Sequence, residues 1–282
     1  MKKIGLIDYY LDEWHANHYP AWIAEANAGY QVCYAYAEAD VPPTGGIDTD
    51  TWCQTHGITR CMRIEELCER SDCLILLSPD HPEKHLPYAK TAFRYGKPCY
   101  VDKTFAPNAQ TAKEIFALAD AYHTPIFSSS ALRFATELIP YQNNAQSVSV
   151  LGGGNLDNYL IHFVEILVTM MGAEVATVSV QNVGANTEFA CKYQDGRVGC
   201  IHMYQTQDRP DFEVSVTDRS GANARYLRLT SPYFQNMIHT LLAWFDGAPT
   251  PVRPAETVAV IALLDAIRLA AKTPWKEIPV QM

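Results

Sequence analysis

Two positions in the chain combine a titratable side chain with a neighbour that could hold it in place. Lys103 and Asp102 directly follow the short apolar run Cys99–Val101, and His162 lies four residues after Asn158. A buried lysine can exchange a proton with a substrate hydroxyl near neutral pH, because burial lowers the pKa of the amine. Residues four apart share one face of a helix, so Asn158 could orient His162. This pattern predicts proton transfer by Lys103 and His162, with Asp102 and Asn158 beside them.

Each of these residues also has a purely structural interpretation. Lys103 could lie in a surface turn, and His162 could be a core histidine among its apolar neighbours Ile161 and Phe163. The proton-transfer hypothesis requires the two side chains to meet in one crevice, which we expect between the two halves of the chain.

A second polar cluster runs from Asp8 to Tyr19 and contains acids, aromatic rings and two histidines. Aromatic faces stack on sugars and carboxylates accept hydroxyl hydrogen bonds, so Trp14 and His15 are candidate contacts for a polar metabolite. Two alternatives stay open. His15, His18, Asp8 and Asp12 could bind a metal, although their spacing matches no template, and the segment could be an ordinary helix start with Asp12 as N-cap.

Polar residues also follow other expected strands. Glu38 comes just after the second strand, where a Rossmann acid binds a ribose diol, and Tyr36 competes with it for that position. Arg133 follows the fifth strand and is either a substrate contact or a salt-bridged surface arginine.

The first half of the chain alternates short apolar runs with segments of helical period, which predicts a doubly wound parallel sheet. We assign this Rossmann-like domain to residues 1–127. The expected strands are Lys3–Ile7, Gln31–Ala37, Cys73–Leu77, Cys99–Val101 and Pro125–Phe127, and the expected helices are His15–Ala28 (closed by Gly29), Thr51–Gly57, Ile64–Arg70, Leu86–Tyr95 and Ala109–Tyr122.

Residues 128–282 show a different rhythm, in which apolar strands follow one another with short turns. Asp195-Gly196 is a strong hairpin signal. We therefore expect an α+β domain with an open, mostly antiparallel sheet. Its strands are Ala176–Val183, Glu188–Tyr193, Gly199–Tyr204 and Phe212–Thr217, and its helices are Leu156–Met171, Tyr233–Phe245 and Pro254–Ala271.

Composition narrows the class of protein. The 282 residues carry 31 acidic and 22 basic side chains, a formal charge of −9, which repels nucleic acids and anionic membranes. No apolar run approaches the roughly 20 residues of a membrane span. Eight cysteines without a C-x-x-C pair predict mostly buried thiols in a reducing compartment. We expect a cytoplasmic protein with a small-molecule substrate, no nucleic acid, no membrane contact and no bound metal.

Four segments, in order along the chain, resemble the motifs of the Gfo/Idh/MocA family of oxidoreductases. They are Ser78-Pro79-Asp80 with His85 following, Gly96-Lys97-Pro98 running to Asp102-Lys103-Thr104, Gly152-Gly153-Gly154 leading to His162, and the closing stretch Ala271–Val280. The segment with Arg133 is similar to a further family element near the substrate. Together these segments span nearly the whole chain.

The resemblance implies a Rossmann domain joined to an open-faced α/β domain, with NAD or NADP as cofactor. It implies that Lys103 is catalytic, that His162 acts beside it, and that Ser78, Pro79 and Asp80 touch the nicotinamide ribose. His85 takes the place of the later histidine of that motif, and Asp8 and Tyr10 fall in the loop that would face the cofactor.

Two departures from the family pattern concern the cofactor loop and the inner helix. Asp8, Tyr10 and Glu13 stand where the family has the three glycines of G-x-G-x-x-G. A carboxylate within about 4 Å of a phosphate costs on the order of 4 kcal/mol at an effective dielectric of 20. Asn158 replaces the family aspartate before His162, and it cannot titrate.

These observations leave two main functions. The first is an NAD(P)-dependent oxidoreductase acting on a hydroxyl of a sugar, polyol or related metabolite. The alternative is a non-catalytic ligand-binding or regulatory protein that has lost canonical dinucleotide binding. A lyase or hydrolase with a tightly held nicotinamide is a third possibility. The open face of the second sheet predicts a homodimer or higher homo-oligomer, with Val178, Val180, Ala190, Val214 and Val216 as candidate sheet positions.

Overall fold

The computed structural model describes residues 1–183, 186–205 and 211–282. The chain forms two compact units, one of Met1–Ser129 with Met237–Arg253 and one of Ser130–Asn236 with Pro254–Met282. The sequence-based division at residue 127 places residues 237–253 in the second domain, whereas in the structure they pack with the first. An amphipathic helix gives no sign in the sequence of which sheet it will cover.

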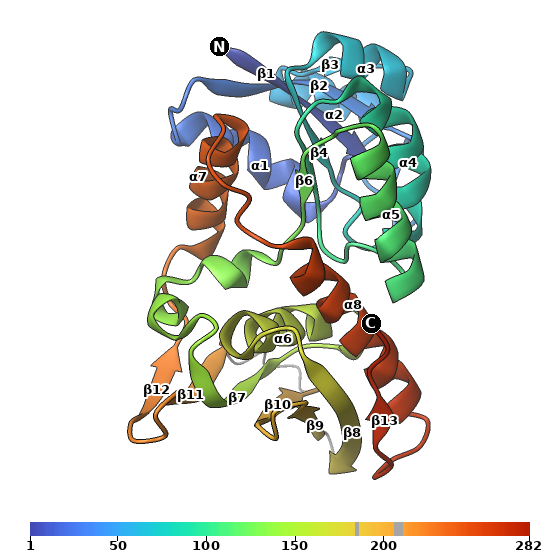
Figure 1. Cartoon of the computed structure of the whole chain (residues 1–282). Helices are drawn as coiled ribbons and strands as arrows, with labels where there is room; N and C mark the ends of the chain where they lie inside the picture. The colour runs from blue at the N-terminus through green and yellow to red at the C-terminus, as the bar shows by residue number, and fades with distance from the viewer. Residues whose placement is uncertain (184–185, 206–210) are drawn as a thin grey trace. The chain divides into compact units, whose positions relative to one another are not determined.

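The first unit contains a parallel sheet of six strands in the order β3-β2-β1-β4-β5-β6 (Figure 1). This is the order of a doubly wound Rossmann sheet, so the predicted fold of this half is confirmed. Its apolar central strands are buried on both faces, as parallel strands between two helix layers must be. The strands are β1 Lys2–Asp8, β2 Tyr30–Ala37, β3 Thr59–Arg60, β4 Cys73–Leu76, β5 Cys99–Val101 and β6 Ile126–Phe127.

Helices follow the strands of this unit, and their bounds are α1 Trp14–Glu25, α2 Thr49–His56, α3 Ile64–Arg70, α4 His85–Ala92 and α5 Ala109–Ala121. Helix α7, Tyr233–Phe245, adds to the unit through Trp244 and Phe245, which contact Phe127 of β6 and Tyr30 of β2. The expected end of α1 at Ala28 with Gly29 after it is wrong. The helix stops at Glu25 because Asn27 already has φ +50°, and Gly29 lies in the turn before β2 with φ +78°.

Parallel pairing brings the carboxyl ends of the strands to one edge. Asp8 ends β1, Ser78 follows β4, Asp102 follows β5 and Ser128 follows β6. Ligands of open α/β sheets bind at this edge. The sheet therefore positions the polar residues that the sequence places after each strand.

The second unit is built on a sheet of seven strands in the order β12-β11-β7-β10-β9-β8-β13. All neighbours are antiparallel except β7 and β10, so the predicted mostly antiparallel sheet is confirmed. The strands are β7 Ala145–Gly153, β8 Val175–Val183, β9 Asn186–Tyr193, β10 Val198–Tyr204, β11 Glu213–Asp218, β12 Ala224–Arg228 and β13 Ile278–Pro279.

Helices α6, Leu156–Met171, and α8, Pro254–Ala270, pack on one face of this sheet. Val178, Val180, Val214 and Val216 are buried beneath the helices, whereas Ala190 lies on the opposite face. The candidate positions for a partner contact therefore divide between the two faces. The four valines form core, and Ala190 alone of the five belongs to the open side.

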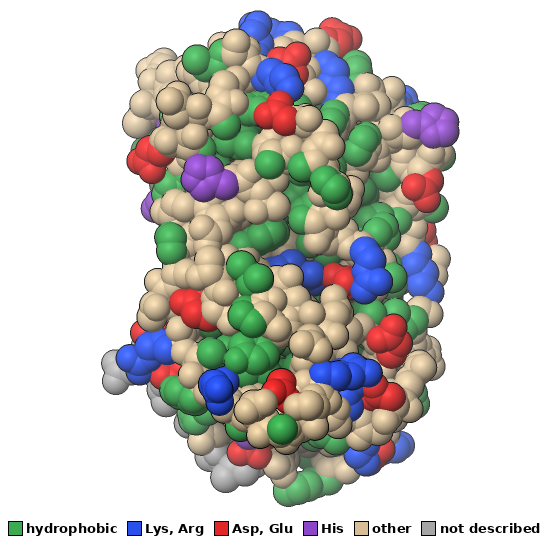
Figure 2. All heavy atoms as spheres, turned by 60° about the vertical axis from the view of Figure 1, so that its left-hand side comes forward, with side chains coloured by type: hydrophobic (Ala, Val, Ile, Leu, Met, Phe, Trp, Pro, Cys, Tyr) green, Lys and Arg blue, Asp and Glu red, His purple; other side chains and the backbone are tan. Residues whose placement is uncertain are grey.

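The surface and the thiols of the described residues are unremarkable for a protein of this size. Figure 2 shows acidic and basic side chains interspersed on the face it draws. The cysteines all carry free thiols and six of the eight are buried, as predicted. None of the helices in the described ranges has the length and apolar character needed to cross a membrane.

Candidate functional site

Five titratable side chains lie at the carboxyl edge of the first unit, and the charges of three of them act on the pKa of the other two. They are Asp8, Glu13, His15, Asp102 and Lys103. Asp8 and Asp102 are 1% exposed and Lys103 is 9% exposed. A buried group of two bases and three acids is costly to assemble unless its charges are paired. This arrangement is typical of a functional site.

His15 lies between two carboxylates. Its Nδ1 is 3.1 Å from Glu13 Oε2, and its Nε2 is 3.9 Å from Asp102 Oδ2. Burial disfavours the imidazolium, but the charges of Asp102 and Glu13 outweigh it and raise the pKa of His15, while Lys103 opposes them. The charged form of His15 is therefore favoured, on the first turn of α1 beside the end of β5.

Asp102 is fixed by the strand and by a buried tyrosine. Its backbone N–H donates to the carbonyl of Leu76, and its Oδ1 lies 3.0 Å from the hydroxyl of Tyr100. The other oxygen, Oδ2, is buried without a hydrogen-bond partner among the described residues. Lys103 follows directly, so the end of β5 presents a carboxylate and an amine at the sheet edge where ligands bind.

Asp8 is the most strongly perturbed carboxyl of the site. Burial raises its pKa well above the usual range, and the charge of Glu13 adds to the effect. Its Oδ1 accepts the Tyr9 N–H at 2.6 Å and the Ser78 hydroxyl at 3.2 Å, which only partly favours ionisation. Asp8 is therefore biased toward a neutral carboxylic acid.

This bias predicts how stability changes with pH. The unfolded chain ionises Asp8 near pH 4, about the value for an exposed aspartate, whereas the folded chain does so only at higher pH. Asp8 therefore removes stability as the pH rises from about 4 toward its folded pKa. We expect Asp8→Asn to raise Tm near pH 8 and to change it little near pH 4. Thermal unfolding measures this. The exposed Asp120→Asn is the control, and a Tm difference that is the same at both pH values would contradict the assignment.

Helix α1 begins with its own anion. Glu13 is the N-cap residue, and its carboxylate accepts the backbone N–H of His15 at 2.9 Å and that of Ala16. The alternative that Asp12 is the N-cap is wrong, because Asp12 instead accepts the Ile47 N–H and the side-chain amide of Asn17. First-turn amides are the groups that hold a pyrophosphate in dinucleotide-binding folds. The residues at this helix end therefore do not fit a dinucleotide.

Glu38 is also paired within the unit. It accepts hydrogen bonds from Lys84 and from the hydroxyl of Tyr88, and Lys84 lies over the ring of Tyr9. Lys84 lowers the pKa of Glu38 through its hydrogen bond, so the carboxylate is charged. A ribose would have to replace one of these contacts.

The remaining candidate cofactor contacts differ in accessibility. Asp80 is exposed, Pro79 is half-buried, and Tyr10 is half-buried beside the ring of His81. His85 is 0% exposed, with Nδ1 2.9 Å from the Phe105 carbonyl and Nε2 2.6 Å from the Leu77 carbonyl. Its ring joins two loops of the edge and presents no exposed surface to a ligand.

Trp14, a predicted substrate contact, occupies the first turn of α1. The residue is 46% exposed. Its ring stacks on that of His18, with 4.5 Å between the ring centroids, and meets the ring of Trp22 edge to face, with 5.6 Å between the centroids. This exposed aromatic surface is of the kind that packs against a sugar ring.

In the second unit, His162 lies half-buried on α6. Its Nδ1 is 2.7 Å from the hydroxyl of Ser130, and its ring contacts Tyr159 and Phe212. Asn158 lies one turn earlier on α6 and is exposed. Its backbone N–H donates a hydrogen bond to the side chain of Asn155, the N-cap residue of the helix. Ser130 fixes the orientation of the imidazole. The pairing of His162 with Lys103 stays a prediction.

Arg133 is a buried ion-pair centre. Its Nε donates to Glu165 at 2.6 Å and its Nη1 donates to Glu256 at 2.7 Å. The residue is 6% exposed, and Nη2 is buried without a hydrogen-bond partner among the described residues. Arg133 thus joins the segment after β6 to α6 and α8, and it is salt-bridged in the interior of the unit instead of at the surface.

Several residues of these clusters carry signals that the sequence analysis did not use. Tyr100 stands two positions before Asp102, so both point to the same side of the strand. Glu165 is the one acid within the apolar helix run Leu160–Met171, which predicts a buried basic partner. Ser130 ends a serine run at the carboxyl end of β6.

The part of the chain that the structure describes holds no group of three or more His, Cys, Asp or Glu side chains arranged to bind a metal ion. His15 and Asp8 instead belong to the charge cluster, and His18 hydrogen-bonds the carbonyl of Trp14 at 2.6 Å. These contacts account for the side chains that could have been ligands.

Comparison with known proteins places the fold. No protein-family model matches the sequence, and no curated protein matches it. Solved structures do match the fold of this chain. One of them is GenD2 from gentamicin A biosynthesis in complex with NAD, which matches at a TM-score of 0.76 and 14% identity and covers 100% of this chain and 97% of that one. The chain has the fold of the Gfo/Idh/MocA-type dehydrogenases.

Two further structures with this fold are similar over nearly their whole length. An oxidoreductase from Agrobacterium radiobacter, in complex with NAD+, L-tartaric acid and magnesium, matches at a TM-score of 0.75 and 14% identity, covering 99% of this chain and 98% of that one. The WlbA dehydrogenase from Bordetella pertussis, in complex with NADH and UDP-GlcNAcA, matches at 0.73 and 14%, covering 99% of both.

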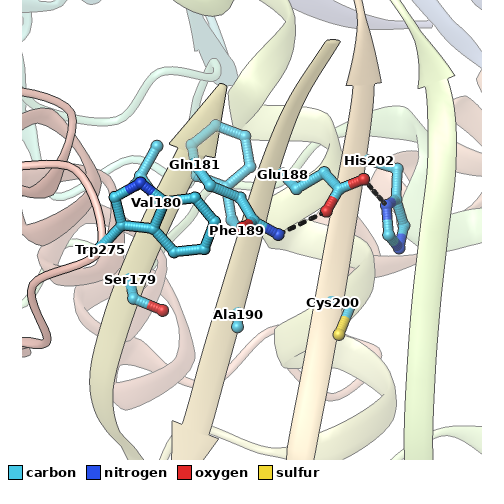
Figure 3. Close-up of a pocket in the computed structure, with 9 residues that line it drawn as sticks. All are labelled: Ser179, Val180, Gln181, Glu188, Phe189, Ala190, Cys200, His202 and Trp275. Carbon is cyan, nitrogen blue, oxygen red and sulfur yellow. Dashed lines mark hydrogen bonds and ion pairs between the residues drawn. The ribbon is translucent and has the colours of Figure 1, made fainter. Parts of the chain in front are cut away.

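A separate hollow lies on the open face of the second sheet, with a volume of about 160 Å³ (Figure 3). Across its floor Gln181 donates to Glu188 at 2.6 Å, and Glu188 lies 3.6 Å from His202. Trp275, 75% exposed, stands at its side. The small residues Ser179, Ala190 and Cys200 leave the floor shallow.

Proposed function

We propose that the protein is an oxidoreductase that acts on a hydroxyl group, or the matching carbonyl, of a sugar, polyol or related metabolite. The observation that carries the proposal is the end of β5, where Lys103 and Asp102 are buried at the ligand-binding edge of the sheet beside His15. Solved structures with the same fold include dehydrogenases bound to nicotinamide dinucleotides.

In this proposal the amine of Lys103 takes the hydroxyl proton or returns it. Asp102 keeps the neighbouring backbone fixed through Leu76 and Tyr100, so the amine is presented from a rigid strand end. The imidazole of His15 lies within the same charge cluster and can exchange a proton with the amine of Lys103. His162, held by Ser130, is the second proton-transfer group of the hypothesis.

The cofactor of the proposal is NAD or NADP. Because Glu13 fills the first turn of α1, no residue of that helix end is assigned to it. The candidate contacts are those that the sequence analysis names after β4, of which Asp80 is exposed and Ser78 is tied to Asp8.

The Glu13 cap also favours a second function, a ligand-binding or regulatory protein without a dinucleotide. Titrating NADH and NADPH into the protein while following fluorescence separates the two. The oxidoreductase proposal predicts saturable binding in the range of about 0.1–10 mM, since one unfavourable carboxylate costs roughly two to three decades of affinity. A titration without any response over that range would favour the ligand-binding protein.

We further propose that a second copy of the chain covers the open face of the second sheet. Helices cover one face of this sheet, and the opposite face carries a hollow walled by the exposed ring of Trp275, an apolar surface that a second copy would remove from water. Small residues on its floor allow two sheets to approach closely.

This proposal predicts the effect of a bulky charge on the floor of the hollow. Ala190→Arg places a long cation where the two faces would meet, so we expect a homo-oligomer to become a monomer in light scattering at the same concentration. The control is Lys113→Arg at an exposed position, which should leave the assembly unchanged. A wild-type protein that is already monomeric would contradict the proposal.

A further inference from the structure

We infer that the carboxylate of Glu13 acts as a built-in substitute for a phosphate at the start of α1, so that the protein does not bind the pyrophosphate of a dinucleotide at this helix end. The inference goes beyond the proposed function, because it concerns an anion site and holds whatever reaction the protein performs.

The backbone donors at the start of α1 are occupied. The N–H groups of His15 and Ala16 both donate to Glu13, one to each carboxylate oxygen. These are first-turn amides of a helix of 12 residues, where an external anion would bind. A phosphate could reach them only after the carboxylate had left.

The carboxylate of Glu13 is held firmly in this place. Its side chain is 8% exposed, and Oε2 also lies 3.1 Å from Nδ1 of His15. The raised pKa of His15 favours its charged form, in which this nitrogen donates to Glu13. Leaving the helix end would therefore break two backbone hydrogen bonds and an ion pair at once.

The loop beside the start of α1 is also held by contacts within the unit. Asp12 accepts the Ile47 N–H at 3.0 Å and the Asn17 side-chain amide at 3.1 Å, and Asn17 in turn accepts the indole N–H of Trp52 at 2.7 Å. These bonds fasten the segment after β2 to the start of α1. A Cβ added at Gly46 would lie 2.4 Å from Asp12 Oδ2, so the two segments approach closely.

The acid that is expected to bind a ribose is also paired within the protein. Glu38, which follows β2, is held by Lys84 and Tyr88. The two anchors that a Rossmann fold offers to an adenosine diphosphate, the first-turn amides and this acid, are thus both satisfied by side chains of the protein.

The test uses inorganic pyrophosphate as the probe and the backbone amide resonances of His15 and Ala16 as the readout. Glu13→Gly removes the internal anion, and Glu13→Gln keeps an oxygen for capping while it removes the charge. Glu25→Gln, an exposed change at the other end of α1, is the matched control.

We expect pyrophosphate to shift both amides saturably in Glu13→Gly with an affinity at least about tenfold higher than in the wild type or in Glu25→Gln, and with an intermediate affinity in Glu13→Gln. Equal affinities in the wild type and in both Glu13 variants would overturn the inference.

A measurement on the wild-type protein covers the case in which neither variant folds. The amide protons of His15 and Ala16 should exchange slowly with solvent, because both donate to the carboxylate of Glu13. Rapid exchange at both amides would overturn the inference. Inorganic pyrophosphate carries no redox group, so none of these results depends on the proposed oxidoreductase activity.

Discussion

Lys103→Met lowers kcat/KM for the oxidation or reduction of the substrate by about 10²–10⁴-fold, if Lys103 transfers the hydroxyl proton. Methionine keeps the length of the buried stem and removes the amine, so the loss is one of chemistry more than of packing. The side chain is 9% exposed and follows a strand that is hydrogen-bonded on both sides, so the variant should fold. Steady-state kinetics, with circular dichroism to check the fold, measure the effect.

The exposed Lys113→Met is the matched control and should leave kcat/KM unchanged within about twofold. The same assay tests the predicted pairing with His162. If Lys103 and His162 act on one proton transfer, the loss in the double variant with His162→Ala is much smaller than the product of the two single losses. If the loss in the double variant equals the product of the two single losses, Lys103 and His162 do not act on the same step. A loss of less than threefold in Lys103→Met would contradict the role of Lys103.

Arg133→Met is expected to destabilise the second unit by about 3–5 kcal/mol, because it removes the guanidinium that two buried carboxylates bond. Glu165 and Glu256 are each about 5% exposed at the side chain, and both bond the same guanidinium. Their repulsion adds to the cost of keeping each charge away from water. Denaturant unfolding followed by the linear extrapolation gives the difference in free energy.

Charge removal on both partners distinguishes ion pairing from packing. The triple variant Arg133→Met, Glu165→Gln, Glu256→Gln should recover most of the lost stability, since no uncompensated charge remains. Lys192→Met, which breaks the exposed pair with Glu277, should leave the stability nearly unchanged. A triple variant as unstable as Arg133→Met alone would show that the arginine stem, not its charge, holds the three segments together.

The architecture of both units could be predicted because their strands differ in pattern. The continuous apolar run Cys73–Leu77 indicates a strand buried on both faces, and Asp195-Gly196 indicates a hairpin. The sequence gives weaker signals for β3 and β13, which have two residues each, and for β7, whose outward positions include Ser147 and Ser149. Pairing with neighbours defines these strands, and a local pattern does not contain that information.

The site was predictable where a residue follows a strand and unpredictable where a distant partner decides its role. Lys103 and Asp102 could be placed at the sheet edge from the run before them. Asp12 and Glu13 are both reasonable N-caps by type. The choice between them depends on Ile47, 35 residues away, whose backbone N–H donates a hydrogen bond to Asp12. Arg133 likewise depends on Glu256, 123 positions later.

The central claim, an oxidoreductase whose proton-transfer group is Lys103, is tested most directly by an assay of redox turnover. The purified protein is incubated with a panel of sugars, inositols and sugar acids together with NAD or NADP, and reduced nicotinamide is followed by its absorbance. The account predicts that at least one polyhydroxylated substrate yields reduced nicotinamide with the wild type and with Lys113→Met but not with Lys103→Met. Equal turnover in Lys103→Met, or a substrate that binds the wild type and is never oxidised with either cofactor, would contradict it.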